Sequence, residues 1–205
     1  MTRKKQSSNQ TKKTDRRLYT LEVFILSGPI TERFAKQHPV ISRTIQIPSD
    51  HTLESLHYAI FDIFDREDEH MYEFQIGGKR PADPKARCYV LPAAFEVDYP
   101  AHKRGGDLTK TTIGSLGLKV NEAFGYWFDY GDDWWHQINV IAITDEVPKG
   151  KYPKLTESVG ESPPQYIDWD EEEDEDDDYD EDDDDEDDEE EEDEEEDEEA
   201  KTGLT

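Results

Sequence analysis

An almost unbroken run of acidic residues near the C-terminus limits where this chain can fold. Residues 170–199 contain 29 Asp or Glu side chains in 30 positions, interrupted only by Tyr179. Such a run cannot bury apolar surface, and the repulsion between its carboxylates keeps it expanded. We therefore predict a disordered acidic tail over residues 170–205. Its composition fits two roles, which are keeping the protein in solution and attracting a basic partner.

The first residues of the chain have the opposite charge. Residues 1–17 hold seven Lys or Arg side chains and one Asp, which predicts a disordered basic arm. Such an arm is either a polar terminus or a contact for nucleic-acid phosphates. It contains no aromatic residue for base stacking, and the acidic tail would repel phosphates or occupy the arm. Nucleic acid is therefore the less favoured partner.

Residues 18–169 remain to form a folded domain. They carry 23 acidic and 15 basic side chains, a net charge of −8, and they are enough for one sizeable core. Cys88 is the only cysteine, which excludes a disulfide within the chain and favours a reducing compartment. The apolar run that begins at Leu18 is too short to span a bilayer. We expect a cytoplasmic protein with no membrane association.

The hydrophobic periodicity predicts several strands and one long helix. Apolar residues at helical spacing, with Thr52 or Asp50 as the N-cap, predict a helix over residues 53–64. A single helical turn is expected at residues 112–117. Alternating apolar residues predict strands at 18–26, 40–47, 70–76, 88–97 (interrupted at Pro92), 123–130 and 134–143. This order predicts one α+β domain, a roll or β-grasp-like fold with a mostly antiparallel sheet and one main helix.

Three histidines are predicted to point inward from three different elements. His57 lies on the apolar stripe of the helix, and His70 and His136 lie on apolar strand faces. If the rings converge, they could bind a divalent metal with Asp132 or Asp129 completing the ligand shell. The alternative is three histidines that each serve packing and hydrogen bonding.

The stretch FDYGDDWWH, residues 128–136, is dense in acids and aromatics. Gly131 and the aspartates favour a hairpin turn between two strands. Trp134 and Trp135 point to opposite faces, and Trp134 shares the core side with His136. Trp127 and Trp135 are the candidate residues of an exposed aromatic binding surface.

No catalytic template is present. The sequence contains none of the motifs GxSxG, GxxxxGK[ST], GxGxxG or HExxH. Cys88 has no surrounding signature of a nucleophile. We therefore assign no catalytic residue and predict no cofactor, apart from the divalent metal of the alternative above.

The order of several segments resembles the plasmid pRiA4b ORF-3-like family. The matching segments are LEVFIL, ISRTIQIPSDHTLESLHYAI, HMYEFQIGG and LGLKVNEAFGYWFDYGDDWWHQINV, with a weaker match at KYPKLTESVGESPPQY. The resemblance spans most of residues 18–169 and excludes both tails. It implies an α+β fold and gives no activity. The chain departs from the family pattern around residues 41–43, 65–66 and 162–166.

These observations leave three hypotheses about function. The leading one is a non-enzymatic domain that binds another macromolecule, most readily a protein, through its aromatic hairpin. The second is a metal-binding protein or metal-dependent enzyme centred on the three histidines. The third is an accessory DNA-binding protein of mobile elements that uses the basic arm.

Overall fold

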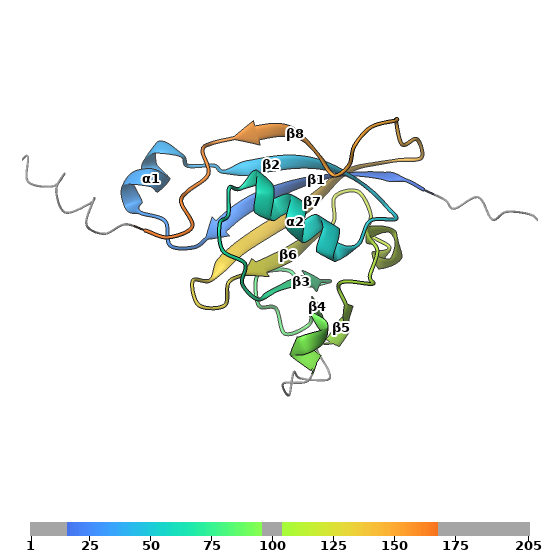
Figure 1. Ribbon diagram of the computed structural model, residues 1–205, viewed down its shortest axis with the longest axis horizontal. Coiled ribbons are helices and arrows are strands. Elements are labelled where there is room, and N and C mark those ends of the chain that lie inside the picture. Colours follow the sequence, from blue (N-terminus) through green and yellow to red (C-terminus); the bar gives the residue numbers. More distant parts are fainter. Residues whose placement is uncertain (1–15, 96–103, 168–205) are drawn as a thin grey trace, which may run out of the picture. The chain divides into compact units, whose positions relative to one another are not determined.

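The computed structural model describes residues 16–95 and 104–167 of the chain. Eight strands form a single sheet in the order β5-β4-β3-β6-β7-β1-β2-β8 (Figure 1). The predicted arm and acidic tail lie outside the described residues, except for Arg16 and Arg17. The elements in chain order are β1 Leu18–Ser27, α1 Glu32–Gln37, β2 Ser42–Pro48, α2 Leu53–Ile63, β3 Tyr72–Ile76, β4 Arg87–Val90, η1 Pro92–Phe95, β5 Arg104–Asp107, η3 Ile113–Leu116, β6 Ala123–Phe128, β7 Trp134–Thr144 and β8 Lys154–Val159.

The sheet is antiparallel except at one edge. The strand β5 pairs with β4 in parallel, and every other neighbouring pair is antiparallel. The 11-residue strand β7 lies in the middle and pairs with both β6 and β1. The β6–β7 hairpin therefore lies at the centre of the sheet, with strands on both sides to fix its orientation.

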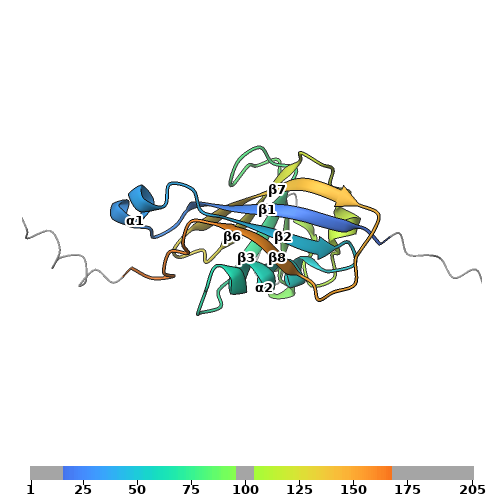
Figure 2. The same cartoon turned by 90° about the horizontal axis from the view of Figure 1, so that it is seen from above.

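The helix α2 lies against one face of this sheet (Figure 2). The Thr52 side chain caps its N-terminus by accepting a hydrogen bond from the Ser55 amide at 3.1 Å. Leu53, Leu56 and Ile60 are almost fully inaccessible and pack into the main core. Burying each aliphatic side chain contributes roughly 1.5–3 kcal/mol, so the apolar stripe fixes the helix on the sheet.

The observed class agrees with the sequence prediction. The α+β fold, the mostly antiparallel sheet, the main helix and the six predicted strand regions are confirmed, although the fourth strand ends before Pro92 and continues as η1. Three elements were not predicted: the short helix α1 and the two edge strands β5 and β8. Trp169, the last residue of the predicted domain, lies outside the described residues.

No helix in the described part of the chain is both long and apolar enough to cross a membrane.

Candidate functional site

The β6–β7 hairpin carries most of the residues singled out in the sequence, and strand alternation divides them between two faces. The pairs Tyr126–His136 and Phe128–Trp134 point toward α2, and all four of these side chains are buried. The pair Trp127–Trp135 points to the other face and is only half-buried. The prediction that Trp134 is inward and Trp135 outward is confirmed.

The turn of the hairpin is built by its aspartates. Asp129 and Asp133 adopt left-handed backbone conformations, with φ of 54° and 55°. The Asp129 carboxylate accepts the Gly131 amide at 3.0 Å and the Asp132 amide at 3.4 Å. Because Asp tolerates positive φ and bonds to its own turn, these residues close the hairpin. The predicted turn is confirmed.

On the inner face, His57 of α2 is held between aromatic rings. Its Nδ1 and the Tyr126 hydroxyl are hydrogen-bonded at 2.7 Å, and its ring stacks on Tyr72 with a centroid separation of 3.5 Å. Burial lowers the pKa of His57 to about 3. The ring is therefore neutral near pH 7, and its described contacts are those of a packed core residue.

His136 is also inside the core, beside the rings of Tyr126 and Phe64. Burial, assisted by the positive charge of Arg66, lowers its pKa to about 3. Neither ring nitrogen has a hydrogen bond of good geometry to a described residue. The backbone of Trp134 and Tyr126 nevertheless lies near enough to favour the protonated ring slightly.

Arg66 joins His57, Tyr126, Trp134 and His136 in an inner cluster, although it was not predicted as a site residue. Its guanidinium lies 3.7 Å from the centre of the Trp134 ring, and Nη1 donates to the Pro163 carbonyl at 3.1 Å. Burial lowers the pKa of Arg66 to about 10, so it remains charged near pH 7. An arginine just after an apolar helix is the only sequence signal, and it does not reveal the ring that the arginine covers.

The prediction of an inward His70 is wrong. The strand β3 begins two residues later, at Tyr72, and the His70 side chain is exposed. Its Nε2 lies 2.9 Å from the Tyr166 hydroxyl and 3.4 Å from a carboxylate oxygen of Asp129. Outside the strand, the two-residue alternation that predicted its direction does not apply.

The three histidines therefore do not assemble into one centre. His57 and His136 each contact Tyr126 on the inner face, whereas His70 lies at the surface beside Asp129. Across the described ranges, no group of three or more His, Cys, Asp or Glu side chains is placed to hold a metal ion. Asp132 contributes its amide to the turn, and no described contact joins it to a histidine.

A C-terminal strap, defined as residues 160–167, closes the inner cluster. Arg43 donates to the carbonyls of Val159 and Gly160 and to the Ser162 hydroxyl. The Gln165 side chain accepts two backbone amides from the loop that follows α2, those of Glu67 and Asp68. These contacts fix the strap to β2 and to the loop that follows α2.

The outer face carries a stack of three aromatic rings. Trp127 and Trp135 are nearly parallel, with centroids 4.5 Å apart, and Tyr130 packs on Trp127 at 4.3 Å. The Trp127 indole nitrogen donates to Asp133 at 3.0 Å. The stack stabilises the hairpin as a cross-strand pair does, and Tyr130 keeps 37% of its surface exposed. Tyr130 was missed in the sequence because turn residues follow no strand alternation.

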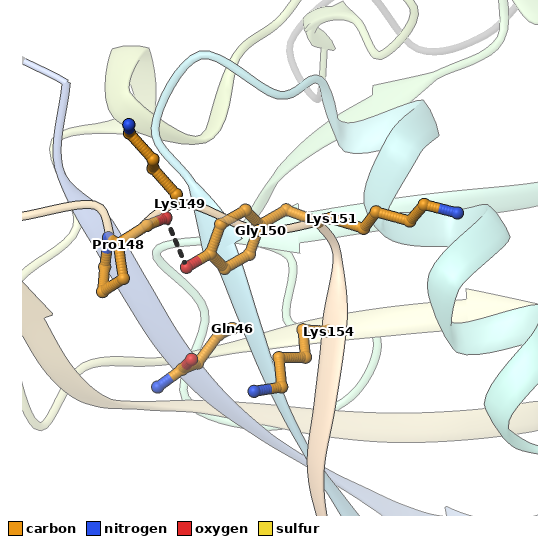
Figure 3. Close-up of a pocket in the computed structure, with 7 residues that line it drawn as sticks. Gln46, Pro148, Lys149, Gly150, Lys151 and Lys154 are labelled. Atoms are coloured by element: carbon orange, nitrogen blue, oxygen red, sulfur yellow. Dashed lines mark hydrogen bonds between the residues drawn. The ribbon is translucent and has the colours of Figure 1, made fainter.

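A second surface feature is a hollow of about 410 Å³ beside the turn that precedes β8, lined by Gln46, Pro148, Lys149, Gly150, Lys151, Tyr152 and Lys154. The three lysine side chains point in different directions (Figure 3). The Tyr152 hydroxyl donates to the Pro148 carbonyl at 3.1 Å and closes the turn on itself. Because the ammonium groups diverge, they do not form a convergent anion site.

Comparison with known proteins places the fold without assigning an activity. The crystal structure of MM3350, a protein of unknown function from Methanosarcina mazei Go1, matches with a TM-score of 0.53 and 22% identity, over 73% of each chain. The comparison with curated proteins gave no significant match. The family model for the plasmid pRiA4b ORF-3-like protein matches residues 33–197, so it starts later than the resemblance seen in the sequence and extends into the acidic segment. A match over that length shows that the chain belongs to the plasmid pRiA4b ORF-3-like protein family.

Proposed function

We infer that this chain is a non-enzymatic protein-binding domain and that its binding surface is the outer face of the β6–β7 hairpin. The observation that carries this inference is the half-exposed stack of Tyr130, Trp127 and Trp135. Large aromatic side chains held rigidly at a surface supply contact area at little cost in conformational entropy, which is why they dominate the energetics of protein interfaces.

The neighbouring strands extend the same surface. Phe24 and Glu22 of β1 and Gln137 and Asn139 of β7 lie on the outer face and are half-buried. The inward side chains that alternate with them are covered by α2 and the core. This surface combines an aromatic centre with a polar surround, which is the usual organisation of a protein interface.

The two other hypotheses have less support. A metal site has no cluster of ligands among residues 16–95 and 104–167. A DNA-binding role depends on the basic arm, which lies almost wholly outside these residues. The cytoplasmic location remains part of the proposal, supported by a sequence with a single cysteine and no disulfide.

Photo-crosslinking tests the proposal. A benzophenone amino acid placed at Gln137, next to the stack, should crosslink a partner in cells, and Trp135→Ala should reduce the yield of that crosslink. A benzophenone at the exposed Tyr58 of α2 serves as the matched control for nonspecific capture. The partner is then purified, and its affinity for the wild-type chain and for Trp135→Ala is measured by calorimetry. Equal affinity for the wild-type protein and for Trp135→Ala would show that the outer face of the β6–β7 hairpin is not the binding surface.

A further inference from the structure

The side chains that the four central strands place on the outer face include acids and no base. The four adjacent strands β3, β6, β7 and β1 contain no Lys or Arg at all. Their only two acids are Glu73, which pairs with Trp127, and Glu22, which pairs with Asn139. Since Asn139 and Trp135 lie on the same side of β7, both carboxylates lie on the aromatic face.

Carboxylates also lie next to the aromatic stack itself. Asp133 accepts the Trp127 indole N–H at 3.0 Å at the edge of the stack. Glu73 pairs with Trp127 across the strands, but it is buried, and its carboxylate accepts a hydrogen bond from the Gln75 side chain at 2.6 Å. Asp132 adds a further acid in the same turn. The accessible negative charge beside the rings therefore lies in the turn, on Asp132 and Asp133.

This combination favours one chemical class of ligand. The negative face of an indole or phenol ring attracts a cation, and an adjacent carboxylate pairs with the same cation. A guanidinium suits such a site best, because it can stack on a ring and donate to a carboxylate in one geometry. Phosphate groups, in contrast, would be repelled by Glu22, Asp133 and the −8 net charge of residues 18–169.

We propose that the outer face of the β6–β7 hairpin binds an arginine- or lysine-rich segment of a partner protein, with the cationic side chains stacked on Trp135 and Tyr130 and paired with the exposed carboxylate of Asp133. Trp127 lies between the other two rings, so Trp135 and Tyr130 form the ends of the stack. The acidic residues 170–199 would speed the encounter with such a partner through long-range attraction. This inference rests on the proposed function and specifies the chemistry of its partner.

The test must separate the aromatic face from the acidic residues 170–199, which attract any polycation. The full chain contains four tryptophans, and each indole N–H gives its own resonance in a ¹⁵N spectrum. Single Trp→Phe variants assign these resonances. The probe is a nine-residue peptide of alternating Gly and Arg, compared with peptides in which Lys or Glu replaces Arg.

We expect the arginine peptide to shift the Trp127 and Trp135 resonances saturably, the lysine peptide to do so more weakly, and the glutamate peptide to have no effect. Trp135→Ala and Asp133→Asn should each weaken the binding seen at the remaining indole by about fivefold to tenfold. Asn accepts the positive φ of position 133, so the second variant removes the charge and keeps the turn. Tyr58→Ala, on α2, should leave the affinity unchanged.

Three results would overturn the proposal. The first is a shift confined to Trp169, which would place the peptide on the acidic segment. The second is an unchanged affinity in Asp133→Asn and Trp135→Ala. The third is the absence of any shift. If neither basic peptide moves the two resonances while the crosslinked partner still requires Trp135, the basic partner class is wrong and the protein-binding function stands.

Discussion

Lowering the pH from 7.5 to 5.0 should destabilise the fold by about 4 kcal/mol through its two buried histidines. Burial holds the pKa of His57 and of His136 at about 3, against an ordinary value of 6.5. At pH 5.0 both rings stay neutral in the folded state, whereas the unfolded chain protonates them. The unfolded state therefore binds more protons, and the free energy of unfolding falls by about 2 kcal/mol per ring as the pH falls.

Urea denaturation followed by tryptophan fluorescence at the two pH values measures this loss. In each of the variants His57→Gln and His136→Leu, the free energy of unfolding should fall by about 2 kcal/mol between pH 7.5 and 5.0, instead of about 4 kcal/mol. This expectation does not depend on how stable either variant is at pH 7.5. His51→Gln removes an imidazole from the turn before α2 and keeps both buried rings, so it retains the wild-type loss. If both core variants show the same pH dependence as the wild type, the buried imidazoles are not its source.

Three further substitutions test individual contacts by the same denaturation assay. Tyr126→Phe removes the 2.7 Å hydrogen bond to a buried imidazole and should cost about 1–2 kcal/mol; no loss would mean that this bond adds nothing to stability. Arg43→Met deletes five hydrogen bonds, which should lower the free energy of unfolding by about 2–4 kcal/mol. Amide hydrogen exchange in the C-terminal strap should also become faster. An unchanged exchange rate would show that other contacts hold the strap. Gly28→Ala places a methyl group against the Trp134 ring and should cost about 1–3 kcal/mol. Gly150→Ala is the control, because the added methyl group would lie 3.8 Å from the Tyr152 ring, an ordinary contact. Equal stability of the two variants would refute the overpacking argument.

The elements predicted from the sequence are those whose signal is local. The helix α2 repeats its apolar residues at helical spacing, and the β6–β7 hairpin alternates on both sides of a turn built from Gly and Asp. The two missed strands have no such signal. The strand β5 has the sequence RGGD, and it forms a strand by pairing with β4. The strand β8 has the sequence KLTESV, with every side chain exposed, and it pairs with β2. Pairing with a distant neighbour, rather than residue preference, makes both of them strands.

The candidate site follows the same division. Alternation within β7 correctly predicted which of Trp134 and Trp135 is inward, because both lie inside a regular strand. The direction of His70 was wrong because alternation was extended past the beginning of β3. Arg66 was missed because its ring partner is 68 positions away and its carbonyl partner, Pro163, is 97 positions away. Contacts of that range depend on how the strap, the helix and the sheet come together.

The two faces of the hairpin are coupled through the register of its strands. Tyr126–His136 and Trp127–Trp135 are adjacent rungs of one ladder, so a slip of one residue would expose the first pair and bury the second. The buried contacts of the inner face oppose that slip, because His57, Tyr72 and α2 fit only the observed side. The inner cluster thus determines which rings reach the surface. A destabilising substitution there can weaken binding at the outer stack without touching it, and binding data for inner-face variants must therefore be compared at equal folded fraction.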